Sequence, residues 1–418
     1  MKQTEIGLIP DDWEVKSIDE FATLTSGESP SKFKFVDTGI PYYKVEQMNN
    51  SLKYQNETPF YIEKLTCVQK GSIIFPKRGA AIETNKVRIL SQDSFFDTNI
   101  MSVTLNETVN NEYFYYWLVK KELWQIADTT SIPQINNKHI KPLLVPIPPL
   151  PEQRLIAKAL SDVDALISTT EKLIQKKKNI KQGSMQNLLT GKKRLPGFCP
   201  QTKSPAYKQT ELGLIPEDWE VKNINKECTI KARIGWQGLK STEYLDSGDY
   251  ILITGTDFDS GFINWKSCSY VSKWRFDQDK NIQIKRGDVL ITKDGTIGKV
   301  AFLNEIPMQG TLNSGVFVIR PKNPDKMDSV FLSLIFKSFW FDAFLEQITS
   351  GSTIVHLYQK DFVKFNFPLP SKEEQTAIAN VLSSMDKEIE TLNTKLEKYH
   401  NLKTAMMQQL LTGKIRLM

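Results

Sequence analysis

The fold of this chain is decided by Gln153–Arg194, which reads QRLIAKALSDVDALISTTEKLIQKKKNIKQGSMQNLLTGKKR. When the sequence is shifted by 222 positions, this stretch aligns without a gap with Gln375–Arg416. Nineteen of the 42 aligned positions are identical, including the closing Leu-Leu-Thr-Gly-Lys. Because the period is about half of the 418-residue chain, the repeat indicates a duplicated unit and not a solenoid.

Both copies have the pattern of a long helix with a coiled-coil seam, because apolar residues recur at steps of three and four. Pro151 suits the first turn of one helix, and Ser371 with Glu374 suits a capping box at the start of the other. Gly191 and Gly413 lie where a left-handed C-terminal residue is expected. Each helix would span roughly 55–60 Å at ~1.5 Å per residue, and a pair of ordinary core helices is the alternative. The predicted seam comprises Ile156, Leu160, Val163, Ile167, Thr170, Ile174, Lys177 and Ile180 in the first copy, and Ile378, Leu382, Met385, Ile389, Leu392, Leu396, Tyr399 and Leu402 in the second.

A second repeat opens each half of the chain. Residues 2–16 recur almost unchanged at 208–222, an offset of 206, so the second intervening region is 16 residues longer than the first. Both intervening regions mix short predicted strands and helical runs, and each includes a glycine turn followed by a buried strand. The predicted division is a first domain at 1–150, a first long helix at 151–191, a linker at 192–207, a second domain at 208–370, and a second long helix with the C-terminus at 371–418.

The order of these parts predicts that the two long helices are antiparallel. The ends of a compact domain often lie close together, so the second helix should start near the end of the first and run back along it. The predicted fold class is therefore α+β, with two mixed α/β domains joined by two long antiparallel helices that form a coiled-coil spacer with internal pseudo-two-fold symmetry. Two-fold DNA-binding proteins engage half-sites about 34–36 Å apart, and a spacer of this length can hold two domains at that order of distance.

Motifs in both halves resemble those of the specificity subunit of type I restriction-modification systems. They are Ile-Pro-x-x-Trp, which ends at Trp13 and Trp219, Pro-Pro-Leu-Pro-Glu-Gln at 148–153, and Leu-Leu-Thr-Gly-Lys, which ends at Lys192 and Lys414. The resemblance covers the whole chain. It implies that the two domains are target recognition domains and that each reads one half of a bipartite, asymmetric sequence in double-stranded DNA.

The same resemblance implies a set of partners. The spacer would set the gap between the half-sites and dock two modification subunits, which bind S-adenosylmethionine and methylate adenine. Restriction subunits would add ATP-driven translocation and cleavage, with Mg²⁺ and ATP as their cofactors. This chain would then be a non-catalytic subunit without a cofactor or metal of its own, acting in the cytoplasm in host defence.

The sequence lacks the motifs that those reactions need. An adenine methyltransferase of this kind needs [Asp/Asn]-Pro-Pro-aromatic, whereas the Pro-Pro pair here lies in Ile147–Leu150. A nucleotide-driven motor needs Gly-x-x-x-x-Gly-Lys-[Ser/Thr], which the residues around Gly191 and Gly413 do not match. Asp11 and Glu14 lie too close together in the chain for two strands to converge on a metal ion, so a turn is the simpler interpretation.

The chain as a whole is only mildly basic. Lys and Arg total 54 against 48 Asp and Glu, a net charge of +6 that does not by itself indicate nucleic-acid binding. Residues 172–194 carry eight basic residues and no acidic one, which suits either a binding surface or a solvated helix face.

The cysteine content predicts a protein of the reducing cytosol. The four cysteines and three histidines lack the spacing of a zinc site. The N-terminal residues lack the apolar core of a signal peptide, and the apolar run at 330–345 predicts a buried helix because it is too short to span a bilayer.

Candidate DNA-contact residues are polar side chains in turn-like segments. Arg, Lys, Asn and Gln can make bidentate contacts with bases, although ordinary surface solvation explains each of them equally well. The candidates are Ser29, Ser31, Lys32, Lys77, Arg78, Gln134, Asn136, Asn137 and Lys138 in the first domain, and Arg233, Gln237, Lys240, Lys293, Ser352, Thr353 and Tyr358 in the second.

Two rival hypotheses belong to other functional classes. A stand-alone DNA methyltransferase or nuclease with divergent motifs would bind S-adenosylmethionine without any partner. A scaffold that uses its helices and domains only for protein contacts would form a complex without salt-dependent DNA binding.

Overall fold

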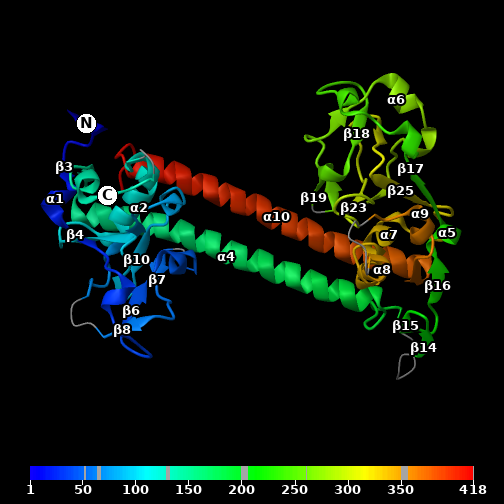
Figure 1. Cartoon of the computed structure of the whole chain (residues 1–418), viewed down its shortest axis with the longest axis horizontal. Coiled ribbons are helices and arrows are strands. Elements are labelled where there is room, and N and C mark those ends of the chain that lie inside the picture. Colours follow the sequence, from blue (N-terminus) through cyan, green and yellow to red (C-terminus); the bar gives the residue numbers. More distant parts are fainter. Residues whose placement is uncertain are drawn as a thin grey trace. The chain divides into compact units, whose positions relative to one another are not determined.

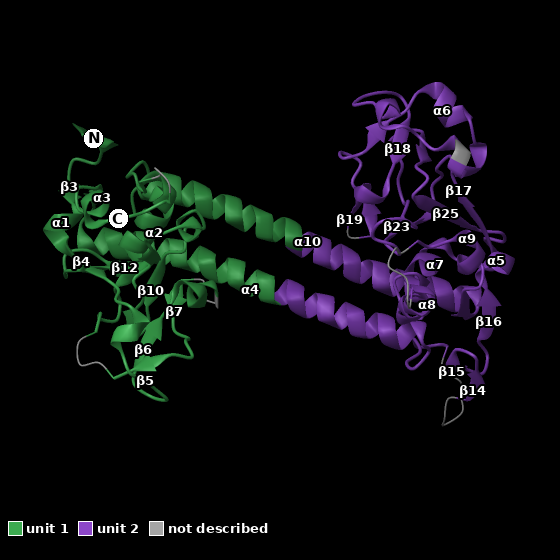
Figure 2. Cartoon of the chain, viewed as in Figure 1, with its two compact units in different colours: residues 1–172, 393–418 green, residues 173–392 purple. Residues whose placement is uncertain are grey.

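A computed structural model describes residues 1–50, 53–63, 67–128, 132–198, 206–259, 261–349 and 356–417. The chain divides into two compact units (Figures 1 and 2): residues 1–172 with 393–418 form unit 1, and residues 173–392 form unit 2. Each unit holds one globular domain and a segment of both long helices. Residues 199–205 of the predicted linker lie outside the described residues.

The described strands and short helices of unit 1 build a mixed α/β domain. The strands are β1 Lys2–Thr4, β2 Gly7–Ile9, β3 Glu14–Ser17, β4 Ala22–Ser26, β5 Phe35–Val36, β6 Ile40–Tyr43, β7 Tyr54–Gln55, β8 Tyr61–Ile62, β9 Ile73–Pro76, β10 Arg88–Leu90, β11 Phe95–Phe96, β12 Ile100–Leu105 and β13 Leu144–Ile147. The helices are α1 Ile18–Phe21, α2 Asn111–Lys121 and α3 Asn137–Ile140. One sheet has the order β4-β12-β9-β10-β7 and another the order β11-β6-β8-β5, while β1 pairs with β2 and β3 with β13.

Unit 2 repeats this plan with different lengths. Its described strands are β14 Tyr207–Thr210, β15 Gly213–Pro216, β16 Glu220–Asn223, β17 Cys228–Ala232, β18 Ile251–Ile253, β19 Phe258–Asp259, β20 Phe262–Ile263, β21 Ser269–Tyr270, β22 Val289–Thr292, β23 Val300–Phe302, β24 Gly310–Leu312, β25 Val316–Pro321 and β26 Asn366–Leu369. The helices are α5 Ile224–Glu227, α6 Lys273–Asp277, α7 Ser329–Ile335, α8 Phe339–Thr349 and α9 Gln359–Phe362. The sheets have the orders β17-β25-β22-β23 and β21-β18-β24, and β14–β15, β16–β26 and β19–β20 form two-stranded ribbons.

The central strand of each domain is buried on both faces, as the sequence predicts. In β9, alternation of side chains places Ile73 and Phe75 in the core with α2, whereas Ile74 faces the core of the second sheet. In β22, Val289 and Ile291 likewise lie in the core with α7, whereas Leu290 lies in the core with β18. Gly71 precedes β9 in the left-handed region, at φ 87°, which explains the glycine turn.

The long helices are α4, Leu150–Leu189, and α10, Lys372–Leu410. Ser371 Oγ accepts a 3.3 Å hydrogen bond from the backbone N–H of Glu374, so half of the predicted capping box is present. The Glu374 carboxylate turns away to Arg194 and Trp219. Gly191 follows α4 at φ 71° and Gly413 follows α10 at φ 69°, which confirms the predicted left-handed caps.

Within each unit the two helix segments run antiparallel. In unit 1, Asp164 of α4 forms a 2.6 Å ion pair with Lys403 of α10. In unit 2, Lys181 of α4 forms an ion pair with Asp386 of α10, and Lys177 forms one of 2.6 Å with Glu388. The 222-residue shift converts Asp164 into Asp386 and Lys181 into Lys403. The identities in the repeat therefore reflect one antiparallel pairing that is made twice, and part of the basic run at 172–194 is neutralised by α10.

Burial confirms most of the predicted seam and corrects two positions. Ile156, Leu160, Val163, Ile167, Thr170, Ile174, Ile378, Leu382 and Ile389 are buried, and Lys177, Met385, Leu392, Leu396 and Tyr399 are half-buried. Ile180 and Leu402 are 45% and 46% exposed, so their assignment to the seam was wrong. The following residues, Lys181 and Lys403, turn toward the partner helix, and a helix rotates by ~100° per residue, so their predecessors face away. The ends of the seam also pack into the domain cores, because Ile156 and Leu160 join the unit 1 core and Ile378 and Leu382 the unit 2 core.

The apolar run at 330–345 forms α7 and the start of α8, where the sequence predicted one buried helix. α7 ends at Ile335 and α8 begins at Phe339, and between them the Ser338 hydroxyl donates to the Ile335 carbonyl at 2.6 Å. Phe339, at the start of α8, is exposed. Among the described residues, no helix has the length and apolar character needed to cross a membrane.

Candidate nucleic-acid interface

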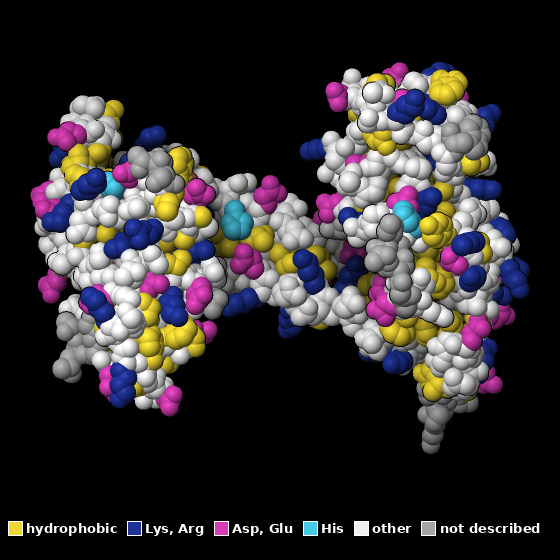
Figure 3. Space-filling model, viewed as in Figure 1, with side chains coloured by type: hydrophobic (Ala, Val, Ile, Leu, Met, Phe, Trp, Pro, Cys, Tyr) yellow, Lys and Arg dark blue, Asp and Glu magenta, His cyan; other side chains and the backbone are white. Residues whose placement is uncertain are grey.

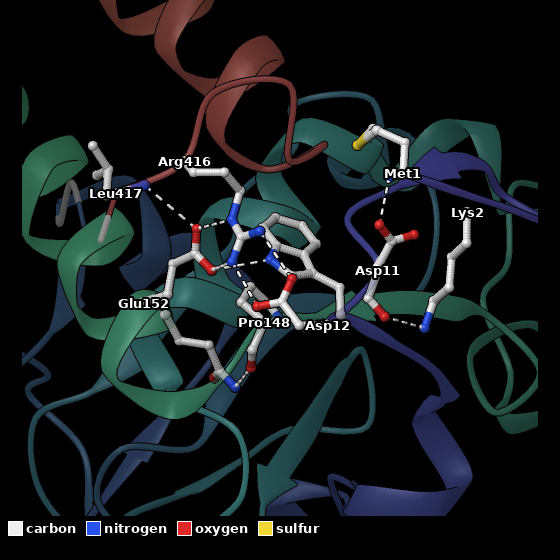
Figure 4. Close-up of polar contacts among 10 residues, drawn as sticks. Met1, Lys2, Asp11, Asp12, Pro148, Glu152, Arg416 and Leu417 are labelled. Carbon is white, nitrogen blue, oxygen red and sulfur yellow. Dashed lines mark hydrogen bonds and ion pairs between the residues drawn. The ribbon is translucent and has the colours of Figure 1, made fainter.

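In unit 1 a buried carboxylate ties the opening motif to both long helices. Glu152, in the first turn of α4, accepts a 3.0 Å hydrogen bond from Trp13 Nε1. Arg416, beyond the end of α10, donates to both oxygens of Glu152 at 2.7 and 2.8 Å and to both oxygens of Asp12 at 2.9 and 2.7 Å. Figure 4 shows the Arg416 guanidinium between these two carboxylates. We call Asp12, Trp13, Glu152 and Arg416 the unit 1 clamp.

Unit 2 contains the same arrangement, the unit 2 clamp of Asp218, Trp219, Glu374 and Arg194. Trp219 Nε1 donates to Glu374 at 3.0 Å, and Arg194 donates to Glu374 at 2.7 and 2.6 Å and to Asp218 at 2.8 Å twice. Hydrogen bonds from Arg194 lower the pKa of Asp218. Burial opposes the charge on Arg194, but the two carboxylates outweigh it and raise the pKa of the guanidinium. Both shifts favour the ionised forms of Asp218 and Arg194.

The glycine of Leu-Leu-Thr-Gly-Lys is needed for contact as well as for conformation. A Cβ on Gly413 would lie 2.4 Å from Pro10 Cδ, and a Cβ on Gly191 would lie 2.4 Å from Pro216 Cγ. The opening motif therefore packs directly against the closing motif in each unit. The repeated motifs therefore have a structural role in each unit.

The glutamine that follows each clamp glutamate fixes the domain to its helix. Gln153 Nε2 donates to the Pro148 carbonyl at 2.9 Å, and its Oε1 accepts from the Asn110 N–H, at the start of α2, at 2.7 Å. Gln375 makes equivalent bonds of 2.9 Å to the Pro370 carbonyl and from the Asp328 N–H, at the start of α7. The orientation of each domain on its helix start is thus set by buried polar contacts.

Away from the clamp, polar side chains of unit 1 gather where β9 ends. The Lys77 N–H donates to the Asn99 carbonyl at 2.8 Å, and the Lys77 carbonyl accepts from the Ile135 N–H at 2.9 Å. Arg78 and Gln134 pair in an antiparallel bridge. The fold therefore brings the predicted residues Lys77, Arg78 and Gln134 together, although 56 positions separate the last two in sequence. Asn136, the N-cap of α3, lies two residues farther on, followed by Asn137 and Lys138.

Unit 2 has the equivalent cluster where β22 ends. The Lys293 N–H donates to the Gly315 carbonyl at 2.9 Å, and the Lys293 carbonyl accepts from the Leu357 N–H, also at 2.9 Å. Tyr358 is the N-cap of α9 and is exposed. Asp294 Oδ1 lies 2.7 Å from His356 Nδ1. We call these two clusters the strand-end sites of unit 1 and unit 2.

Comparison with known proteins identifies the family. A family model described as "Type I restriction modification DNA specificity domain" matches residues 10–182 and again 216–399. The chain belongs to the type I restriction-modification DNA specificity family.

Relatives of known name extend over nearly the whole chain. The type I restriction enzyme MjaVIII specificity subunit of Methanocaldococcus jannaschii is 28% identical, over 98% of this chain and 94% of the relative. The type I restriction enzyme EcoBI specificity subunit of Escherichia coli is 23% identical, over 97% and 87%. The crystal structure of a type I restriction-modification S subunit from M. genitalium matches with a TM-score of 0.59 at 16% identity, over 98% of each chain, which shows a shared fold. The predicted family and the α+β fold class are thereby confirmed.

Within this family fold, burial narrows the set of predicted contact residues. Arg233 is 2% exposed, and its guanidinium donates to the Leu312 carbonyl at 2.9 Å and to Thr311 Oγ1 at 3.1 Å. Gln237 is also buried. A DNA contact from either would require this loop to rearrange, so the structure does not support these two candidates. Lys240 nearby is exposed and remains a candidate.

The remaining candidates fall outside the two strand-end sites. Ser29 and Ser31 share a 2.8 Å hydrogen bond between their hydroxyls, and Lys32 lies 3.6 Å from Glu28 in an exposed ion pair. This loop is joined to the unit 1 site through the segment before β12, because the Gly27 N–H donates to the Ile100 carbonyl at 3.0 Å. Ser352 and Thr353 lie outside the described residues.

Sequence reasoning missed Asp294 and His356. The signal was present, since the 222-residue shift that aligns the long helices also aligns Gln134 with His356 and Asn136 with Tyr358. Asp294 follows Lys293 as Arg78 follows Lys77. Asp294 was overlooked because carboxylates were not considered as base-contact residues, and His356 because the 222-residue alignment was not extended to the residues before the long helices.

The strand-end site of unit 1 is electrostatically mixed and not uniformly basic. Burial lowers the pKa of Lys77, and nearby Arg78 adds to this effect, whereas Asp97 opposes it. Burial in turn raises the pKa of Asp97. Figure 3 shows basic and acidic side chains interspersed over the visible face of each unit. Recognition at such a surface depends on individual side chains more than on bulk charge.

The described residues contain no group of three His, Cys, Asp or Glu side chains that could hold a metal ion. Asp11 binds the N-terminal amine at 2.8 Å (Figure 4), and Glu14 pairs with Lys16 at 2.5 Å. The two carboxylates therefore have different cationic partners and do not converge on a common site. Burial raises the pKa of Cys228 and of Cys268 to about 12, which keeps both thiols protonated and unreactive.

Proposed function

We propose that this chain is the sequence-specificity subunit of a type I restriction-modification complex. In this proposal the domain of each unit reads one half of a bipartite, asymmetric DNA site. The observation that carries the proposal is the presence of the same strand-end site in both units, built on the same backbone hydrogen bonds but carrying different side chains at its surface. Two equivalent frames with different side chains suit two different half-sites.

The strand-end sites offer the chemistry that base reading needs. The major groove presents patterns of acceptors and amino donors that Arg, Asn and Gln can pair with through two hydrogen bonds, while Asp can accept a hydrogen bond from an amino group. In unit 1 these types are Arg78, Gln134 and Asn136, all on short segments held by backbone hydrogen bonds. The rigid frame beneath them supports alignment with base edges.

The long helices suit the role of spacer and docking surface. In unit 1, Leu155 and Leu166 of α4 are exposed and lie three helical turns apart on one face. In unit 2, Leu173 and Ile180 are exposed and are separated by seven residues, also on one face. A row of exposed apolar side chains on one helix face offers surface that another protein can bury. We propose that two modification subunits dock along this helix.

The chemistry would then belong to the partners. Modification subunits would bind S-adenosylmethionine and methylate adenine, and restriction subunits would use ATP and Mg²⁺ to translocate and cleave DNA. This chain would supply sequence recognition and spacing without catalysis, in the cytoplasm.

Reconstitution with the partners tests the proposal. The purified chain should transfer no methyl group from labelled S-adenosylmethionine to DNA, and adding the modification subunits should give methylation at one bipartite motif. Mapping of methylated adenines in cells with and without the gene should show the same motif appear and disappear. Robust methylation by the chain alone, or methylation by the complex without any sequence preference, would contradict the proposal.

A further inference from the structure

Comparison of the two strand-end sites separates positions that are shared from positions that differ. Lys77 is matched by Lys293, and Lys138 is matched by Lys360 under the 222-residue shift. Between them, three positions change chemistry: Arg78 to Asp294, Gln134 to His356, and Asn136 to Tyr358. Each unit therefore has two lysines in common with the other and three polar positions of its own.

The shared strand-end lysine is not explained by an ion pair within the chain. Among the described residues, neither Lys77 nor Lys293 has a carboxylate within ion-pair distance. Asp97, which favours the charge on Lys77, lies after β11, and the residue after the equivalent strand β24 is Asn313. Lys293 instead lies 5.5 Å above the Phe317 ring. The two lysines are therefore retained without a common partner in the described part of the chain.

The helix-start lysine follows the same pattern. Lys138 and Lys360 are both exposed, each two residues after the N-cap of its short helix. Lys360 lies 5.4 Å from the Tyr358 ring, whereas unit 1 has Asn136 at the position of Tyr358, so among the described residues Lys138 has no such ring beside it. A lysine that both units have at the same place, with different neighbours, suits a contact with the phosphate backbone, which every DNA sequence presents.

The three differing positions suit base edges. Arg78 is exposed, and an arginine fork matches the O6 and N7 acceptors of guanine. At the same position unit 2 has Asp294, which can only accept hydrogen bonds when ionised. The 2.7 Å contact with His356 Nδ1 engages Oδ1, and Oδ2 lies 3.6 Å from the position of a Cβ on Gly315. The Asp294 side chain is 41% exposed, so an amino group of cytosine or adenine can reach its second oxygen.

We propose that Lys77 with Lys138 and Lys293 with Lys360 anchor phosphates of the two half-sites, whereas Arg78 reads a guanine in one half-site and Asp294, held by His356, reads a base with an exocyclic amino group in the other. Gln134 and Asn136 complete the reading edge in unit 1, and Tyr358 completes it in unit 2. This inference rests on the proposed function and assigns its base-specific residues.

The test uses the chain assembled with its modification subunits and measures both the methylated motif and the salt dependence of DNA binding. Lys77→Ala and Lys293→Ala should keep the parental motif and make the plot of log affinity against log salt shallower by about 1 each. Arg78→Ala should lower discrimination at one base pair of one half-site by roughly 10- to 100-fold. Asp294→Asn should change the preferred base at one position of the other half-site only.

Lys70→Ala is the matched control, because Lys70 is exposed and lies before β9, at the opposite end of the strand from Lys77. It should change neither the motif nor the salt slope. A changed motif with Lys77→Ala, or an equal loss of affinity for all duplexes with Arg78→Ala, would overturn the assignment. Arg78→Lys keeps the charge but not the fork, so a relaxed guanine preference in that variant would support the assignment even if the alanine variant did not assemble. A wild-type complex without any preferred motif would contradict the proposed function itself, which distinguishes the two failures.

Discussion

Replacement of Arg194 by methionine should destabilise unit 2 more than the equivalent Arg416→Met destabilises unit 1. Glu374 is 1% exposed and accepts two hydrogen bonds from Arg194, at 2.6 and 2.7 Å, and one from Trp219. Arg194→Met leaves this carboxylate buried with only the indole as partner. Removal of one partner from a buried ion pair costs about 3–5 kcal/mol, which is a large share of the roughly 5–15 kcal/mol that stabilises a typical domain.

The unit 1 clamp provides an internal comparison. The Arg416 side chain is 23% exposed and Glu152 is 5% exposed, so water can partly replace the lost guanidinium. We therefore expect Arg416→Met to cost about 1.5–3 kcal/mol, the range for hydrogen bonds to charged groups. Each clamp lies within one unit, so each effect should be local.

Hydrogen exchange measured by mass spectrometry resolves the two effects, because it reports the opening free energy of individual peptides. In Arg194→Met, protection should fall in peptides of β15, β16 and the start of α10, while peptides of the unit 1 core keep theirs. Adding Glu374→Gln to Arg194→Met should restore part of the loss, because the unpaired charge is then removed. A loss below about 1 kcal/mol, or a loss from Arg416→Met that equals or exceeds it, would refute the reasoning from burial.

Three further predictions concern the helix ends, pH and the spacer. Gly191→Ala should destabilise unit 2 by at least about 1–2 kcal/mol, because φ is 71° and the new Cβ would lie 2.4 Å from Pro216. Gly183→Ala should instead stabilise the chain by up to about 1 kcal/mol, because Gly183 lies inside α4 and no atom lies within 4 Å of the new Cβ. Thermal unfolding measures both effects. Because Arg194 lowers the pKa of Asp218, this pair stabilises the folded state above the ordinary aspartate range, and the contribution is lost as the pH falls below about 4. The urea midpoint of Asp218→Asn, which removes this titration and keeps Arg194 on Glu374, should therefore depend less on pH in that window than that of wild type. Insertion of four or seven residues near Lys176–Lys178 adds roughly 6 or 10 Å of helix and should widen the gap of the methylated motif by one or a few base pairs. Insertion of two residues should instead place the seam out of phase and weaken assembly. An unchanged gap in the active longer variants would show that α4 does not set the spacing.

The long helices were predictable because their information is local. Period, proline position and terminal glycines specify α4 and α10 to within a few residues of their observed ends. The exposure of Ile180 and Leu402 was not predictable from one helix alone, because it depends on the ion pairs that Lys181 and Lys403 make with the other helix. The second half of the capping box failed for a similar reason, since a distant arginine competes for Glu374.

The strand-end sites were only partly predictable. Lys77, Arg78 and Gln134 were identified by type and turn-like context, but their proximity results from the antiparallel bridge between two distant segments. Arg233 and Gln237 were indistinguishable from them in sequence, and tertiary packing then buried both. His356 was overlooked because its equivalence with Gln134 becomes visible only when the internal repeat is extended to the residues before the long helices.

The most direct test of the account is to exchange one domain and map the methylated motif. Residues 17–149 can be replaced by the equivalent region of a related subunit, which leaves Trp13, Glu152 and Arg416 of the unit 1 clamp in place. The account predicts that the assembled complex methylates a motif in which one half changes to that of the donor, while the other half and the gap stay parental. A change in both halves, or no change in either, in a folded and active complex would contradict the claim that each unit reads its own half-site.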